Sequence, residues 1–171
     1  LPKEAVQITG KVVIPGDEFV KARASFKVLG AVRDALVAYD PKAASIAEVL
    51  NEVMLGALVQ RASDVHFEPG DKNVRLRYRI DGLLHDIMLD FRKEAYARLL
   101  SRIKLLSKLK LNVTSEPQDG RFSLVLPEGK EVEVRTSVIP SEYGETVVLR
   151  VLYQDALTMN LDSLGLRADD L

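Results

Sequence analysis

The chain has 171 residues, 47% of them hydrophobic, so it is long enough to form one domain with a buried core and an appended segment. Its formal net charge of −1 does not indicate a nucleic-acid-binding or membrane-surface protein. The absence of cysteine excludes thiolate catalysis, disulfides and cysteine zinc sites, and it is typical of a cytoplasmic protein. We find no signal peptide and no apolar run near the roughly 20 residues of a membrane span, and we expect an excised piece of a longer protein.

The first part of the chain differs from the rest. Its segment "AVQITGKVVI" predicts one or two short strands, and the following "PGDE" predicts a turn. Between residues 25 and 39 apolar residues recur at helical spacing, and Pro41 should end that helix because proline disfavours helical backbone in the residue before it. We interpret residues 1–42 as an N-terminal extension or linker of unknown role.

A stronger helix is predicted over residues 45–62. Ser45 and Glu48 form the pattern of a capping box, in which each residue satisfies a free backbone N–H of the first turn. One apolar stripe follows this helix: Ile46, Val49, Leu50, Val53, Met54, Ala57 and Leu58. The stretch "ASDVHFEP", residues 62–69, then predicts a strand.

The polar residues of this strand are Asp64, His66 and Glu68, which share one face because strand side chains alternate. Three such groups could hold a cation. However, only one histidine is present in the stretch, and alternating polar residues are typical of any strand with one polar face. We therefore favour a solvated or hydrogen-bonded strand face over a metal site.

The segment "NVRLRYRIDGLLHDIML" predicts a hairpin whose turn is Asp81-Gly82, the pair that type I′ turns favour. In this hairpin we expect His85 to be a packed residue. The predicted register pairs Ile80 with Leu83, Tyr78 with His85, and Arg77 with Asp86.

Three arginines of this hairpin, Arg75, Arg77 and Arg79, share one strand face. Like charges on one face repel each other unless an anion compensates them. Asp86 and solvent could do so, or the arginines could bind a polyanion such as a nucleotide phosphate. The residues alone favour the first interpretation.

A second amphipathic helix is predicted over "RKEAYARLLSRIKLLSKL", with an apolar side formed by Tyr96, Leu99, Leu100, Ile103 and Leu106. Its basic residues are expected on the exposed side: Arg98, Arg102, Lys104 and Lys108. No aromatic residues alternate with them, so nucleic-acid binding is not predicted. After a loop come three strands, over 121–127, 130–139 and 146–153, joined through Glu128-Gly129 and "PSEYGE".

This order of elements predicts an α+β fold, a mostly antiparallel sheet with helices packed on one face. No phosphate-loop pattern G-x-x-x-x-G-K-[ST], nucleophile elbow G-x-S-x-G or zinc motif H-E-x-x-H occurs. We predict no catalytic residue within this chain, and the residues by themselves indicate a binding or regulatory domain.

Six phrases occur in order: "ASDVHFEP", "RYRIDGLL", "LLSRIKLLSKL", "PQDGR", "EVEVRTSVIPSEYGETVVLRVL" and "LDSLGL". From near Ala44 to near Leu166 the chain thereby resembles the domain that precedes the motor domain in type II secretion and type IV pilus assembly ATPases. The resemblance implies a PAS-like domain over residues 43–155 and, over 156–171, a connector toward a RecA-like motor domain.

For the full-length protein the resemblance implies ATP and Mg²⁺ as cofactors and assembly into a hexamer. Expected partners are its own motor domain, neighbouring subunits and inner-membrane secretion or pilus platform proteins, with neither nucleic acid nor membrane insertion. The location expected is cytoplasmic and peripheral to the bacterial inner membrane. The isolated chain should not hydrolyse ATP because it lacks the phosphate loop.

The resemblance also implies that two arginines of this domain reach the phosphates of nucleotide bound on the motor domain. The matching positions are Arg77 and Arg92, with Arg75 and Arg79 as alternatives to the first and Arg98 to the second. A structural pair between Arg77 and Asp86 is the competing role. The alternative for the whole chain is a free-standing PAS-like module that binds a ligand or a protein.

Overall fold

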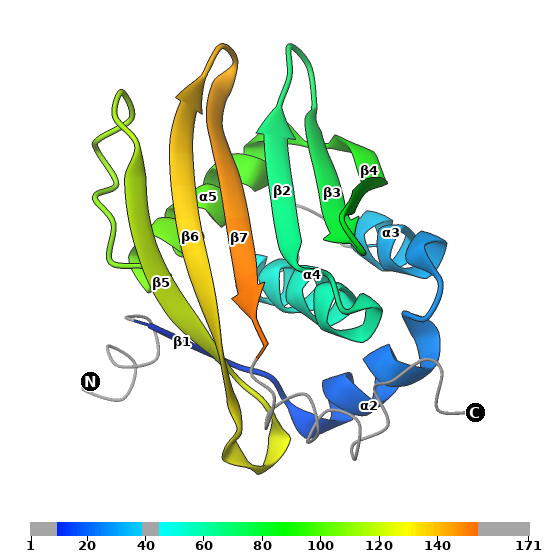
Figure 1. Ribbon diagram of the computed structural model, residues 1–171. Coiled ribbons are helices and arrows are strands. Elements are labelled where there is room, and N and C mark those ends of the chain that lie inside the picture. Colours follow the sequence, from blue (N-terminus) through cyan, green and yellow to red (C-terminus); the bar gives the residue numbers. More distant parts are fainter. Residues whose placement is uncertain (1–9, 39–44, 154–171) are drawn as a thin grey trace.

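The computed structural model describes residues 10–38 and 45–153 (Figure 1). The strands in these ranges are β1 (Lys11–Val13), β2 (Asp64–Pro69), β3 (Val74–Ile80), β4 (Leu83–Phe91), β5 (Gln118–Val125), β6 (Glu131–Ser141) and β7 (Gly144–Leu152). The α-helices are α2 (Gly16–Ser25), α3 (Leu29–Val37), α4 (Ile46–Gln60) and α5 (Lys93–Leu106). The predicted tail, residues 154–171, lies outside the described residues.

All seven strands belong to one sheet with the order β1-β5-β6-β7-β2-β3-β4. Its neighbours are antiparallel except for β1 and β5, which are parallel. Helices α4 and α5 lie behind the sheet in Figure 1, which leaves its front face open. The predicted α+β class, with a mostly antiparallel sheet, is confirmed. None of the helices described is long and apolar enough to cross a membrane.

The N-terminal segment differs from the prediction in two ways. The predicted turn at "PGDE" is wrong, because Gly16 begins α2 with Pro15 as its N-cap and with Asp17 and Glu18 in the first turn. Acidic side chains at that end stabilise a helix through its dipole. The helix predicted over residues 25–39 is observed as the shorter α3, which starts only at Leu29, and its predicted end before Pro41 lies outside the described residues.

Part of this segment packs into the same core as the rest of the chain. Strand β1 pairs with β5, while Phe19 and Ala22 of α2 and Val32 and Leu36 of α3 are buried. Helix α4 contacts both N-terminal helices as well as the sheet, and all its residues from Val49 to Val59 except Asn51 and Glu52 are buried. This explains why its apolar surface is wider than the predicted stripe.

Gly56 of α4 occupies the most crowded part of this layer. A Cβ atom there would lie 2.5 Å from the hydroxyl of Tyr78 and 2.9 Å from Cγ1 of Val32. The Tyr78 hydroxyl donates a hydrogen bond of 2.6 Å to the carbonyl of Val53, which joins β3 to α4. Glycine thus permits the close approach of α3, α4 and β3.

The predicted Ser45 cap of α4 and the predicted Asp81-Gly82 hairpin are confirmed. The hydroxyl of Ser45 caps α4 by accepting from the Ala47 N–H. Asp81 (φ 51°) and Gly82 (φ 81°) have the positive φ angles of a type I′ turn. The predicted register is observed in full, with Ile80 opposite Leu83, Tyr78 opposite His85, and Arg77 opposite Asp86.

Candidate functional site

One face of the sheet is not covered by the helices described, and we call it the open face. On β2 and β3 the side chains of Val65, Phe67, Leu76 and Tyr78 are buried toward the helices. The alternate side chains belong to the open face: Asp64, His66, Glu68, Arg75, Arg77 and Arg79. The sequence pattern therefore placed both polar triplets on the same side, and the register brings them opposite each other.

Arg77, the first predicted phosphate contact, lies on the open face between two carboxylates. Its Nε is 3.1 Å from Oδ1 of Asp86, and its Nη1 is 3.7 Å from Oε1 of Glu68. The contact with Asp86 meets the distance of an ion pair but not the geometry of a hydrogen bond. With 23% of the side chain exposed, Arg77 is a partly buried and largely compensated cation. Its alternative Arg75 is more exposed and lies 4.0 Å from the same Glu68 oxygen.

Asp64 is buried, and its carboxylate lies between arginines of two neighbouring strands. Arg150 of β7 donates to Oδ1 over 2.9 Å, and Nε of Arg79 lies 3.5 Å from Oδ2. The hydroxyl of Ser63 also donates to Oδ2. The hydrogen-bonded alternative for this strand face is therefore the one observed at Asp64. Arg150 was not a candidate from the sequence, because only the pairing of β2 with β7 places it there.

The side chain of His66 is half-buried on the open face, next to Glu68 at 3.6 Å. Burial lowers the pKa of His66 below its ordinary value of 6.5, and the charges of Arg79 and Arg77 lower it further against the opposing effect of Glu68 and Asp64. The imidazole is therefore neutral at pH 7. In the described parts of the chain no three histidine or acidic side chains gather into an arrangement suited to a metal ion.

Arg92, the second predicted phosphate contact, is the N-cap residue of α5 and is exposed. Its backbone carbonyl accepts the first intrahelical hydrogen bond, from the Tyr96 N–H. Within residues 10–38 and 45–153, no ion pair involves its guanidinium. It is thus more accessible to an external anion than Arg77 is.

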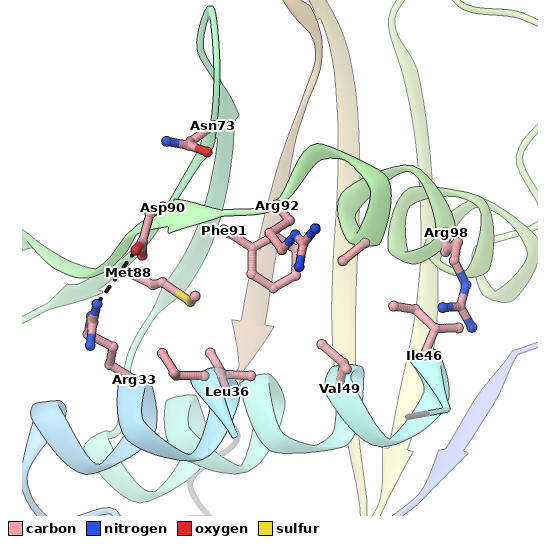
Figure 2. A pocket seen from close by; sticks show the side chains of 12 residues that line it. Arg33, Leu36, Ile46, Val49, Asn73, Met88, Asp90, Phe91, Arg92 and Arg98 are labelled. Atoms are coloured by element: carbon pink, nitrogen blue, oxygen red, sulfur yellow. Dashed lines mark ion pairs between the residues drawn. The ribbon is translucent and has the colours of Figure 1, made fainter. Parts of the chain in front are cut away.

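Arg92 lines a cavity of about 430 Å³ that lies between α3 and α4 on one side and β4 and the start of α5 on the other. Arg98, the alternative to Arg92, lines the same cavity, as does Arg33 of α3 (Figure 2). Nη2 of Arg33 lies 3.7 Å from Oδ2 of Asp90. Arg33 was not a candidate from the sequence, since nothing local to "AVRDAL" indicates that α3 packs next to β4.

The two predicted phosphate contacts therefore lie in different surroundings. Arg77 belongs to the open face, whereas Arg92 lines a cavity on the side of the sheet that carries the helices. The fold does not bring the two guanidinium groups to one face of the sheet. Any ligand that engages both would have to reach around the edge strand β4, which is the last strand of the sheet.

Two of the basic residues predicted to be exposed on α5 are not, since Arg102 is partly buried and Lys104 is buried. Lys104 is 2% exposed, and its Nζ donates to Oε1 of Glu145 over 2.9 Å and to the carbonyl of Val113 over 3.3 Å. The hydroxyl of Tyr96 donates to the backbone carbonyl of Glu145. The expectation failed because Glu145 comes from β7, which the periodicity of the helix cannot reveal.

Comparison with known proteins agrees with the resemblance in the sequence. A family model described as "Type II/IV secretion system protein" matches residues 40–171. The type IV pilus assembly ATPase PilB of Myxococcus xanthus is 37% identical over 128 residues, which cover 75% of this chain and 22% of that protein. The type II secretion system protein E of Pseudomonas aeruginosa is 40% identical over 127 residues, which cover 74% of this chain and 25% of that protein.

A solved structure, the Legionella pneumophila ATPase DotB, aligns with a TM-score of 0.49 and 14% identity over 75% of this chain and 36% of that chain, a likeness too weak to carry an argument. The chain spans about a quarter of the length of the curated relatives it matches. The sequence match, by contrast, extends over β2 to β7 and both helices α4 and α5. The chain therefore belongs to the type II/IV secretion system protein family.

Proposed function

We propose that this chain is the N-terminal, non-hydrolytic part of a type II secretion or type IV pilus assembly ATPase and that it has a PAS-like fold. Relatives with these activities in their names support the proposal. The chain contains no phosphate loop, so ATP and Mg²⁺ would bind on a RecA-like motor domain elsewhere in the full-length protein. The role of the part described here is to supply positive charge to that nucleotide.

The accessible guanidinium of Arg92 is the observation that carries this role. Guanidinium groups suit phosphate because they remain charged at all physiological pH values and donate two parallel hydrogen bonds. Arg92 is exposed at the first turn of α5, where the free N–H groups and the helix dipole also favour an anion. Arg92 therefore fits the terminal phosphates of a nucleotide held by another domain.

Arg77 is the second proposed phosphate contact. To bind a phosphate it would exchange its present carboxylate partners for the phosphate oxygens. Its contacts with Asp86 and Glu68 must weaken before a phosphate can engage it. The bent geometry of the contact with Asp86 makes that exchange less costly than the loss of a well-formed pair. Attraction between these arginines and the phosphates would draw the two domains together, and loss of the terminal phosphate would release them.

In this proposal the full-length protein works as a hexamer beside the inner membrane. Its subunits contact each other and the platform proteins of a secretion or pilus machine, and they stay on the cytoplasmic side. Motion of this domain relative to the motor transmits the energy of hydrolysis to those partners. No contact with nucleic acid and no insertion into the membrane form part of the mechanism.

The test is ATP turnover of the full-length protein with Arg92→Ala, Arg77→Ala or Arg121→Ala. Arginines that stabilise phosphate charge commonly contribute several orders of magnitude to turnover, so Arg92→Ala should lower kcat at least about tenfold. Arg77→Ala should lower it as well. Arg121 is exposed on β5, far along the sheet order from β3 and β4, and its substitution should leave kcat unchanged.

Unchanged turnover in Arg92→Ala would disprove the phosphate contact. For Arg77, the thermal unfolding of each variant must be measured in parallel, because its removal leaves Glu68 and Asp86 without their cation. Lost turnover with an unchanged unfolding temperature supports phosphate binding. Lost turnover together with unfolding assigns Arg77 to the hairpin alone.

A further inference from the structure

Arginines form a line across the open face of the sheet, at right angles to the strands. Arg135 of β6 lies opposite Arg150 of β7, and Arg150 lies opposite Asp64 of β2. On its other side Asp64 lies opposite Arg79 of β3. Figure 1 shows these four strands side by side, with the open face toward the viewer. Arg121 of β5, opposite Arg135, continues the line by one strand. We call Arg135, Arg150 and Arg79 the arginine row.

The two outer members of the row on β6 and β7 present their charge to solvent. The side chains of Arg135 and Arg150 are 67% and 65% exposed, whereas that of Asp64 is 3% exposed. Arg135 and Arg150 are also directly opposite each other, an arrangement in which like charges repel. An anion above the row would relieve this repulsion.

Neighbouring carboxylates hold these two guanidinium groups by one nitrogen each. Nε of Arg150 donates to Oδ1 of Asp64 over 2.9 Å, and Nε of Arg135 donates to Oε2 of Glu133 over 3.2 Å. Within residues 10–38 and 45–153, no hydrogen bond of these two side chains involves their terminal nitrogens. The two terminal groups of an arginine can donate parallel hydrogen bonds to one carboxylate. Each guanidinium is therefore held in place and still able to bind a further carboxylate.

The row is narrow, which favours a narrow partner. Acidic side chains lie near it: Glu133 is two residues from Arg135 along β6, and Glu68 and Asp86 lie beside Arg77. A broad anionic surface, such as a membrane rich in anionic lipids, would meet these carboxylates as well as the row. A single α-helix laid along the row would meet mainly the arginines.

Aliphatic side chains flank the row on β7. Val148 and Leu152 lie two residues to either side of Arg150, so they share its face, and both are partly buried. Within the described strands β2, β3, β6 and β7, no aromatic side chain belongs to this face, which disfavours the stacking of nucleic-acid bases. Arginine next to aliphatic surface suits a protein partner.

We propose that the arginine row binds an amphipathic α-helix of a protein partner, with acidic residues at positions i, i+4 and i+11. Neighbouring strands are roughly 4.8 Å apart. A helix rises about 1.5 Å per residue, so i and i+4 are about 6 Å apart and match the single strand step from Arg135 to Arg150. Positions i+4 and i+11 are about 10.5 Å apart and match the two steps from Arg150 to Arg79.

The three acidic positions share one side of the helix, because at about 3.6 residues per turn they fall within about 40° of each other. Asp64 occupies the step between Arg150 and Arg79, so position i+8 of the helix should not be acidic. Aliphatic residues beside the acidic positions pack on Val148 and Leu152. The row contains neither Arg77 nor Arg92, so this contact does not depend on the proposed binding of nucleotide phosphate.

The experiment measures binding of a fluorescein-labelled helical peptide to the 171-residue chain by fluorescence anisotropy. The first peptide carries glutamate at i, i+4 and i+11, leucine beside them, and alanine and glutamine elsewhere. We expect saturable binding of one peptide per chain, weakened by salt. A second peptide with glutamine at the three positions should bind about tenfold more weakly, which corresponds to about 1.4 kcal/mol shared among three exposed ion pairs.

A third peptide separates the arrangement of charge from its amount. It carries the same three glutamates at i, i+2 and i+9, which place them on opposite sides of the helix. It should bind as weakly as the glutamine peptide. These three measurements use the unsubstituted chain, so they do not depend on the stability of any variant.

Two variants of the chain then locate the site. Arg135→Glu removes one attraction and adds a repulsion, so it should weaken binding of the first peptide at least about tenfold. Arg33→Glu is the matched control, because Arg33 is also exposed and paired with one carboxylate but belongs to α3. It should leave the Kd unchanged. Thermal unfolding of both variants shows that folded chains are compared.

Equal binding of the first and third peptides would overturn the proposal, since net charge alone would then explain the attraction. Equal loss of binding in Arg135→Glu and Arg33→Glu would do the same. Sedimentation of the chain with vesicles of phosphatidylglycerol and phosphatidylcholine tests a membrane as the partner. Vesicle binding that is lost in Arg135→Glu, without any preference among the peptides, would assign the row to a lipid surface and reject the helix.

Discussion

At the scale of single residues, the open face shows how burial changes ordinary surface chemistry. The carboxylate of Asp64 is 3% exposed, which would be costly for an isolated charge, and Arg79 and Arg150 compensate it from both neighbouring strands. His66 lies beside it and remains neutral because burial disfavours the imidazolium. The sequence pattern of Asp64, His66 and Glu68 could have held a cation, but in the structure arginine side chains compensate the carboxylate of Asp64.

The pKa of His66 leads to a prediction about stability and pH. Because its folded-state pKa is below 6.5, the unfolded chain binds a proton that the folded chain does not in the interval between the two values. The His66 contribution to the free energy of unfolding is therefore complete above pH 6.5 and decreases as the pH falls below it. Urea unfolding at pH values between 7.5 and 5 measures this loss.

His66→Gln should flatten the dependence of the urea midpoint on pH in that interval. His85→Gln, which changes the only other histidine, is the matched control and should retain the wild-type slope. An unchanged slope in the His66→Gln chain would show that other groups cause the loss of stability in acid.

At the scale of elements, α5 is attached to the β6–β7 hairpin through a buried polar cluster. Lys104 pairs with Glu145, and Tyr96 donates to the backbone carbonyl of Glu145. Directly after the end of α5, the hydroxyls of Ser107 and of Thr136 on β6 are 2.8 Å apart. One carboxylate oxygen of Glu145 has no partner among the described residues, so the pair depends on Lys104 for compensation.

Lys104→Met should destabilise the chain by about 3–5 kcal/mol, because it leaves the carboxylate of Glu145 buried without a cation. Denaturant unfolding measures the change. Lys110→Met, at an exposed lysine just beyond the same helix, is the control and should cost less than about 0.5 kcal/mol. Equal effects of the two substitutions would mean that the pair contributes nothing to holding α5 in place.

At the scale of the whole molecule, the N-terminal segment and the family domain share one sheet and one core. Strand β1 extends the sheet at β5, α2 and α3 both pack against α4, and α3 also contacts β4. Gln60 of α4 donates to the carbonyl of Phe26, which follows α2. The predicted boundary near residue 42 separates two parts of the sequence. The described part of the N-terminal extension nevertheless packs into the same core as the rest of the chain.

Removal of residues 1–44 should lower the temperature of unfolding and broaden the transition, because buried residues of α4 such as Gly56, which lies beside Val32, would lose their cover. Differential scanning calorimetry measures this. In the intact chain, Val32→Ala on the buried side of α3 should act in the same direction, whereas Val20→Ala at an exposed position of α2 should not. A truncated chain with the stability of the intact one would show that the N-terminal layer is dispensable.

Local signals predicted the elements from α4 onward because their causes are local. The Asp81-Gly82 turn determines the hairpin register, and the spacing of apolar residues identifies α4 and the buried side of α5. The N-terminal helices were less predictable. There the apolar spacing predicted α3, whereas α2 was expected to begin as a turn at "PGDE" and buries only Phe19 and Ala22.

The sequence by itself determined the α+β class, the hairpin register, the shared face of the arginines, and the family, because periodicity, turn chemistry and ordered motifs act over short distances along the chain. Tertiary structure decided which charged residues meet. Arg150, which donates to Asp64, is 86 residues away from it, and Glu145, which pairs with Lys104, is 41 residues away. The cavity around Arg92 likewise required α3 to pack beside β4. Such pairings follow from how strands and helices come together in space, which no spacing within one element specifies.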